Sequence, residues 1–130
     1  MLIRSLFTGL ATSLMLVSNV AAASQPTEYP ALLVEVTNTS HVCQRFDASG
    51  REYTPRGDKH VPPYLQREAA PGETVTFEGL EGQRSMVWAT PHETKECTSR
   101  ITGIGYTYSP PAPRAKITFD GTTFHFVGEL

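Results

Sequence analysis

The stretch 114–127, RAKITFDGTTFHFV, decides the fold because it contains the clearest hairpin signal in the chain. Asp120-Gly121 stands between two runs of alternating apolar and polar residues, a pattern typical of a two-residue β-hairpin loop. That loop would pair Ile117 with Phe124 and place the apolar side chains of both strands on one face. The residues sharing this face are Ala115, Ile117, Phe119, Phe124 and Phe126. We therefore expect a C-terminal β-hairpin with one face toward the core.

Toward the N-terminus, further short β-rich runs alternate with turn residues. The expected strands are 31–37, 41–46, 73–78, 84–90 and 99–108, with turns at 38–40, 47–50, 70–73 and 79–82. In the strand 84–90 we expect Met86 and Trp88 to face the core. The segment 64–69 fits either an edge strand or one helical turn. This pattern predicts an all-β fold, an antiparallel β-sandwich or small barrel of about seven short strands.

One helix is expected among these strands. Thr90 at the N-cap, Pro91 at the first helical position and Glu93 three residues after the cap form a capping box. We expect a short helix from Pro91 to about Cys97. A stiff, proline-rich connector, 109–113, then leads into the hairpin.

The N-terminal residues have the pattern of a cleavable signal peptide. A short basic start with Arg4 precedes an uncharged apolar run and small residues near Ala23. A membrane anchor is the alternative, but no basic stop-transfer cluster follows the run. We expect a signal peptide at 1–23, a flexible arm at 24–30, and a single exported β domain at 31–130. The protein would be secreted or periplasmic, without stable membrane insertion after cleavage.

The charge argues against a nucleic-acid partner. The formal net charge is −2 at pH 7, and loss of Arg4 with the signal peptide makes it one unit more negative. Binding to a phosphate backbone needs a concentrated basic surface. Charges of both signs are interspersed here, so we expect no nucleic-acid binding.

The two cysteines, Cys43 and Cys97, are expected to form a disulfide, as a cysteine pair does in most exported chains. Closing the long loop between them would stabilise the fold by about 4 kcal/mol in the chain-entropy model.

Surface histidines near these cysteines suggest an alternative, an exported copper- or zinc-binding protein. A Cys43–Cys97 bond would bring His41 and His92 close together, and Glu96 lies one helical turn after His92. A zinc site that used the cysteines would compete with the disulfide. A blue-copper site is disfavoured because no His or Met closely follows Cys97. We therefore expect no cofactor and keep His41, His92 and Glu96 as metal candidates.

Catalysis is the second alternative. No spacing supports a nucleophilic triad, and no nucleophile elbow is present. A small secreted hydrolase or nuclease would use His125 with Arg114, Glu78 and Lys116. The hairpin register already explains His125 as a solvent-facing residue opposite Lys116, so we assign no catalytic residue and do not expect an enzyme.

The remaining irregular stretch, 51–63, is expected to be a long loop, and long loops in small domains are commonly functional. It contains Arg56-Gly57-Asp58, and a separate pair of tyrosines lies on one face of the strand 99–108. The residues expected to contribute to binding are Arg56, Asp58, Lys59, His60, Tyr106 and Tyr108. Asn38 begins a glycosylation sequon that matters only in a eukaryotic producer.

Together these patterns favour a small exported, non-enzymatic protein that recognises another macromolecule, most simply a protein. An inhibitor, an effector, an immunity protein or an adhesion module would each fit this description.

Overall fold

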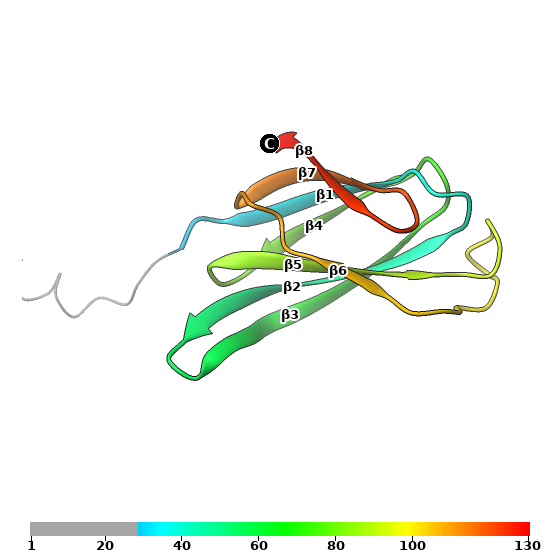
Figure 1. Ribbon diagram of the computed structural model, residues 1–130. Helices are drawn as coiled ribbons and strands as arrows, with labels where there is room; N and C mark the ends of the chain where they lie inside the picture. Colours follow the sequence, from blue (N-terminus) through cyan, green and yellow to red (C-terminus); the bar gives the residue numbers. More distant parts are fainter. Residues whose placement is uncertain (1–28) are drawn as a thin grey trace, which may run out of the picture.

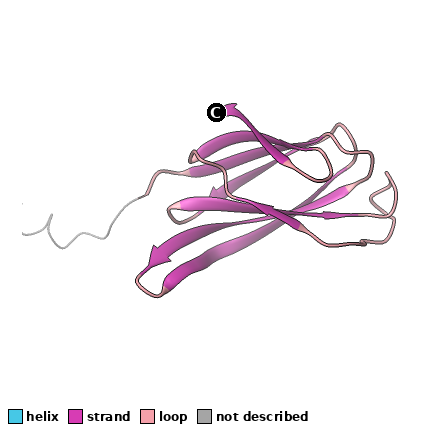
Figure 2. Cartoon of the chain, viewed as in Figure 1, coloured by secondary structure: helices cyan, strands magenta, loops and turns pink. Residues whose placement is uncertain are grey.

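The computed structural model describes residues 29–130. The expected signal peptide (1–23) and most of the expected arm (24–30) lie outside the described residues. Within 29–130 the regular secondary structure consists of eight strands and no helix (Figure 2). The strands are β1 (Leu32–Asn38), β2 (Gln44–Thr54), β3 (Gly57–Ala69), β4 (Thr74–Leu80), β5 (Arg84–Pro91), β6 (Tyr106–Tyr108), β7 (Arg114–Phe119) and β8 (Phe124–Glu129).

The strands form two four-stranded sheets that face each other as a sandwich (Figure 1). One sheet has the order β4-β1-β7-β8, and the other has the order β3-β2-β5-β6. β1 pairs antiparallel with β4 and parallel with β7. The proline-rich connector after β6 carries the chain from the second sheet back to the first (Figure 1). The expected all-β, sandwich-like architecture is confirmed, with eight strands in place of about seven.

The core lies between the sheets and follows the alternation of each strand. β1 illustrates the rule, since Leu32, Val34 and Val36 are buried while the residues between them are half-buried. Burying a large apolar side chain stabilises a fold by about 1.5–3 kcal/mol. The buried apolar cluster comprises Leu32, Val34, Val36, Phe46, Ala48, Ala69, Phe77, Leu80, Val87, Ala89, Ala115, Ile117 and Phe119.

The C-terminal hairpin is present, but its predicted two-residue loop is wrong. The loop is 120–123, and the register pairs Phe119 with Phe124 and Ile117 with Phe126. The Asp120 carboxylate accepts the backbone N–H groups of both Thr122 and Thr123, which stabilises the longer turn. From Ile117 to Phe119 the register differs by two residues from the predicted one, so these side chains and their partners keep their predicted faces, although Phe126 on the edge strand is exposed. His125 lies opposite Thr118 and not opposite Lys116.

The predicted helix 91–97 is wrong. Pro91 is the last residue of β5 and pairs with Gln44 of β2, while His92 forms a bridge with Ile101. The Glu93 side chain pairs with Arg100 instead of closing a capping box. Sheet hydrogen bonds hold the chain extended where the helix would have begun, and a helix of this length has little intrinsic stability against them.

The predicted turn 47–50 and the predicted long loop 51–63 are also wrong, because both belong to one hairpin made by β2 and β3. β2 pairs with β3 on one side and β5 on the other, and Ala48 on it faces the core. Two neighbouring strands override the local turn preference of Asp47-Ala48-Ser49-Gly50. The segment 64–69 is an edge strand, the end of β3.

The predicted core face of β5 is the wrong one. Ser85, Val87 and Ala89 are buried, whereas Met86 and Trp88 are half-buried on the outer face. The large side chains suggested the core, but the space between the sheets at this point accommodates small residues.

Of the predicted strand 99–108, only the C-terminal end forms a strand, which is β6. No helix in residues 29–130 is long and apolar enough to cross a membrane.

Candidate functional site

The end of the β2–β3 hairpin projects beyond its sheet (Figure 1). β2 pairs with β5 only as far as Arg51, which lies opposite Arg84. Beyond that point Glu52, Tyr53 and Thr54 pair only with Lys59, Asp58 and Gly57 of β3. We call residues 52–59 the ribbon. Its side chains are outside the core cluster, so packing of the core does not restrict which residues can occupy these positions.

Polar and aromatic contacts at the base of the ribbon hold it in place. Arg51 forms an ion pair with Asp58, and its guanidinium lies 5.5 Å from the centre of the Tyr53 ring. Arg84 Nη1 donates to the Tyr53 hydroxyl over 3.2 Å, and Tyr53 N donates to Gln83 Oε1 over 2.6 Å. These contacts tie the ribbon to β5 and to the turn before it, which makes it an ordered projection.

The ribbon contains three of the six residues expected to bind a partner, and a fourth follows it directly. Arg56 lies in its turn, and Arg56 and Lys59 are exposed. Asp58 is held by Arg51. His60 follows directly, exposed on β3, with its ring centre 5.2 Å from the Trp88 ring on the outer face of the sheet. These predicted residues are thus brought together on one arm, although as a hairpin and not as a loop.

Tyr106 and Tyr108 lie elsewhere. Both are on β6, opposite Ala89 and Val87, and their rings pack toward the other sheet. The Tyr106 ring is 5.7 Å from that of Phe119, and the Tyr108 ring stacks at 5.3 Å on that of Phe124. They close one side of the sandwich, which accounts for both rings by packing, although Tyr106 remains exposed.

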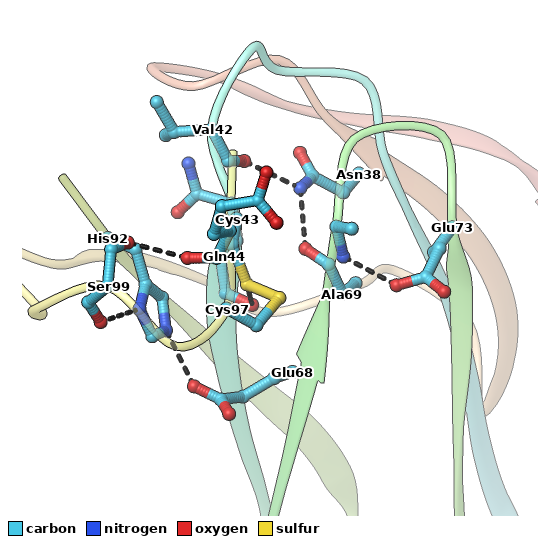
Figure 3. The surroundings of a disulfide bond; sticks show 12 residues. Asn38, Val42, Cys43, Gln44, Glu68, Ala69, Glu73, His92, Cys97 and Ser99 are labelled. Carbon is cyan, nitrogen blue, oxygen red and sulfur yellow. Dashed lines mark hydrogen bonds and ion pairs between the residues drawn. A yellow bond between two sulfur atoms is a disulfide. The ribbon is translucent and has the colours of Figure 1, made fainter. Parts of the chain in front are cut away.

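A second group of side chains surrounds the Cys43–Cys97 disulfide, whose predicted pairing is confirmed (Figure 3). His92 is 3% exposed and lies beside it. His92 Nδ1 is 2.7 Å from the Ser99 carbonyl oxygen, and Nε2 is 2.6 Å from Glu68 Oε2. Both ring nitrogens therefore face oxygen acceptors, and the ring is fixed in orientation. The disulfide is compatible with an oxidising extracellular compartment.

This second group differs from the predicted metal ligands. Among the described residues, Cys43, Glu68 and His92 are the three metal-ligating side chains whose ligand atoms lie within 4.8 Å of one another. His41 and Glu96 are exposed and do not belong to this group. The sequence did not predict Glu68 as a member of this group, because Glu68 is 24 residues from His92. It approaches His92 only through the pairing of β3 and β5 with β2.

The residues weighed for catalysis are spread over the first sheet. Glu78 is on β4 and His125 is on β8, at opposite edges of the order β4-β1-β7-β8. Three spacings of about 4.8 Å put these strands roughly 14 Å apart. Lys116 reaches toward Glu35 at 3.9 Å. Glu78 and Arg114 line one shallow depression that does not include His125. The four side chains therefore do not converge on one reacting atom.

His125 has a local partner in the hairpin loop. Its Nε2 lies 2.9 Å from Asp120 Oδ2. The pKa of Asp120 is held well below its usual value, first by this side-chain hydrogen bond and then by the backbone N–H groups of Thr122 and Thr123. The pair stabilises the turn that sets the hairpin register.

No family model, curated protein or solved structure matches this chain. The geometry of the ribbon and of the disulfide group is thus the basis for any assignment of function.

Proposed function

We propose that this chain is an exported, non-enzymatic binding protein that recognises another protein through the ribbon. An inhibitor, effector, immunity or adhesion role is compatible with this assignment. The observation that carries the proposal is the ribbon itself, an anchored two-stranded projection whose side chains are outside the core.

Order in the ribbon supports a binding role. A segment that is already fixed before association loses less conformational entropy when the complex forms. The contacts of Arg51 and Arg84 with Tyr53 supply this order at the base. The turn is closed by Thr54 Oγ1, which donates to the Gly57 carbonyl oxygen over 2.6 Å, and Gly57 has the positive φ of 117° that this turn requires.

The chemistry of the ribbon favours a polar protein surface as the partner. Glu52, Arg56 and Lys59 present both signs of charge, and His60 adds an exposed imidazole next to Trp88. Mixed charges of this kind contribute to specificity and to the association rate between proteins. The ribbon does not have the concentration of basic side chains that binding to a nucleic acid would require.

Recognition is expected to use side chains and not extension of the sheet. β3 is an edge strand, and edge strands are common sites of strand addition. Pro62 and Pro63 have no backbone N–H, and they lie where the register between β2 and β3 is irregular. The middle of this edge is therefore a poor template for another strand.

The test uses a photo-crosslinking amino acid in place of Lys59, and in place of Lys95 as the control. Lys95 is exposed in the turn between β5 and β6, at the opposite end of the sandwich (Figure 1). In the exported fraction of the producing cells, position 59 is expected to capture a defined protein that position 95 does not.

That protein is then purified and its affinity measured. The double variant Arg56→Glu/Lys59→Glu is expected to weaken binding at least tenfold, about 1.4 kcal/mol. The matched control Lys95→Glu/Arg100→Glu reverses the same number of charges at the other end and is expected to leave the affinity unchanged. Equal cross-linking from both positions, or equal effects of both variants, would remove the ribbon as the binding site.

A further inference from the structure

We propose that reduction of the Cys43–Cys97 disulfide converts this end of the sandwich into a zinc site. Its ligands would be Cys43, Cys97, His92 and Glu68. The inference rests on the second group of side chains and is independent of the ribbon.

The donor atoms are already gathered. Cys43 Sγ, a Glu68 carboxylate oxygen and a His92 ring nitrogen lie within 4.8 Å of one another, and Cys97 Sγ is bonded to Cys43 Sγ. Two thiolates, an imidazole and a carboxylate are all ligands that Zn(II) accepts in a tetrahedral site. Figure 3 shows the imidazole and the carboxylate directed toward the same space beside the sulfur atoms.

The His92 ring is oriented as a metal ligand requires. Its Nδ1 donates to the Ser99 carbonyl oxygen over 2.7 Å, so in a neutral ring Nε2, which now faces Glu68 Oε2, holds the lone pair that would bind the metal. In metal sites the second ring nitrogen of a ligating histidine is usually hydrogen-bonded in this way, which fixes the ring and its tautomer. Burial of His92 to 3% exposure keeps this orientation rigid.

The ligands can open to the spacing that zinc needs. Bonds of 2.0–2.3 Å place tetrahedral ligand atoms about 3.3–3.8 Å apart, whereas His92 Nε2 and Glu68 Oε2 are now 2.6 Å apart. Glu68 has a side chain that is 41% exposed on an edge strand, and Cys97 lies in the irregular segment between β5 and β6. These two ligands can shift outward, while Cys43 and His92 remain fixed by burial.

The chemistry balances with a dithiol as reductant. The dithiol supplies two electrons and two protons and becomes a disulfide, while the Cys43–Cys97 bond breaks to give two thiols. Zn(II) then displaces the two thiol protons to solvent and binds two thiolates, neutral His92 and the Glu68 carboxylate. The metal would restrain the same two segments that the disulfide restrains in the oxidised protein.

The experiment compares oxidised protein with protein reduced by dithiothreitol and freed of reductant under anaerobic conditions. Each is titrated with Zn²⁺ alone, and with Co²⁺ as a spectroscopic probe. The reduced protein is expected to bind one Zn²⁺ per chain and to show a thiolate-to-cobalt charge-transfer band. It is also expected to unfold at a higher temperature with Zn²⁺, and the oxidised protein to show none of these effects.

Glu68→Ala and Glu96→Ala form the matched pair of variants. Both residues are exposed carboxylates near the disulfide, so both variants are expected to fold in the oxidised state. Glu68→Ala is expected to weaken zinc binding by the reduced protein at least tenfold, and Glu96→Ala to leave it unchanged. X-ray absorption at the zinc edge provides a second measurement, with two sulfur and two nitrogen or oxygen ligands expected.

Several results would overturn the proposal. These are absence of stoichiometric zinc binding after reduction, a reduced chain that stays unfolded with zinc, or equal binding by oxidised and reduced protein. Equal effects of the two variants, or a ligand set without two sulfurs, would overturn it as well.

Discussion

Asn38 joins three segments of the fold through its buried side chain (Figure 3). Its Nδ2 donates to the carbonyl oxygens of Val42 and Ala69, and its Oδ1 accepts from both the backbone N–H and the hydroxyl of Ser40. Because Nδ2 is buried and uses both hydrogens, a glycan on this atom is incompatible with the folded structure. These hydrogen bonds give Asn38 a structural role in the fold.

Replacing Asn38 by Ala is expected to lower the free energy of unfolding by about 2–4 kcal/mol, because the Val42 and Ala69 carbonyl oxygens would each lose a hydrogen bond, the one to Ala69 in a buried site. Denaturant unfolding measures this change. Gln66→Ala is the control, since it removes an exposed amide with one hydrogen bond to Asp47 and is expected to cost about 0.5 kcal/mol or less. Similar losses in both variants would contradict the structural role of Asn38.

Gly50 marks a close approach between β2 and the turn after β4. A Cβ atom on Gly50 would lie 1.4 Å from the Glu81 carbonyl oxygen, which is far inside any possible contact. We expect Gly50→Ala to destabilise the protein by more than about 3 kcal/mol or to prevent folding, because the backbone at Glu81 would have to move away from the added methyl group. Gly128→Ala has open space around it and is the control. Thermal unfolding measures the stability of both variants. A Gly50→Ala protein as stable as the Gly128→Ala protein would contradict this close approach.

Asp120 gives the hairpin a defined pH dependence. Its pKa is lowered from 3.8, chiefly by the hydrogen bond to His125. A carboxyl group with a lowered folded-state pKa stabilises the fold above its unfolded-state pKa, and this stabilisation is lost as pH falls toward the folded-state value. The difference in Tm between wild type and Asp120→Asn is therefore expected to be constant at neutral pH and to shrink below about pH 4.

His125→Ala removes the largest cause of the Asp120 shift. In this background the loss of stability is expected to begin at the same pH, because the unfolded-state pKa is unchanged, but to be smaller and to be complete at a higher pH. A Tm difference between wild type and Asp120→Asn that stays constant down to about pH 2 would rule out the interaction as a source of stability.

The β2–β3 hairpin is the element whose rigidity the proposed function requires. Tyr53→Ala removes the contact with Arg51 and the hydrogen bond from Arg84, together about 1–1.5 kcal/mol at an exposed site. Local opening of the ribbon should then increase roughly fivefold to tenfold, and trypsin should cleave after Arg56 faster by that factor.

Mass spectrometry of the fragments measures cleavage after Arg56. Tyr64→Ala, which removes an exposed tyrosine 64% accessible on the same hairpin, is the matched control and is expected to leave the rate unchanged. An equal rate in Tyr53→Ala and wild type would show that the arginine contacts do not hold the ribbon.

At the scale of the whole molecule, the disulfide links Cys43, the residue before β2, to the irregular segment after β5 across a sequence separation of 54. The chain-entropy model assigns about 4 kcal/mol to a loop of this length. Cys43→Ala/Cys97→Ala is expected to lose stability of this order in denaturant unfolding, and reduced wild type without metal is expected to match it. A loss below about 1 kcal/mol would contradict this contribution.

Local pattern predicted some elements well and others poorly, for identifiable reasons. The alternation of 114–127 predicted which side chains of the last hairpin share a face, because side-chain direction repeats every two residues. It did not predict the loop, because the Asp120 carboxylate stabilises a longer turn than Asp-Gly usually makes. The predicted helix at Pro91 was wrong because Pro91 pairs with Gln44 of β2. This non-local interaction is not visible in the local sequence.

The sequence by itself determined the all-β class, the inward face of β7, and the pairing of Cys43 with Cys97, since these depend on local alternation or on having two cysteines. Only the tertiary structure decided that Trp88 faces outward, that 51–63 belongs to the β2–β3 hairpin, and that Glu68 meets His92 beside the disulfide. These features depend on which strands become neighbours. That choice reflects the packing of the whole core, and no short stretch of sequence records it.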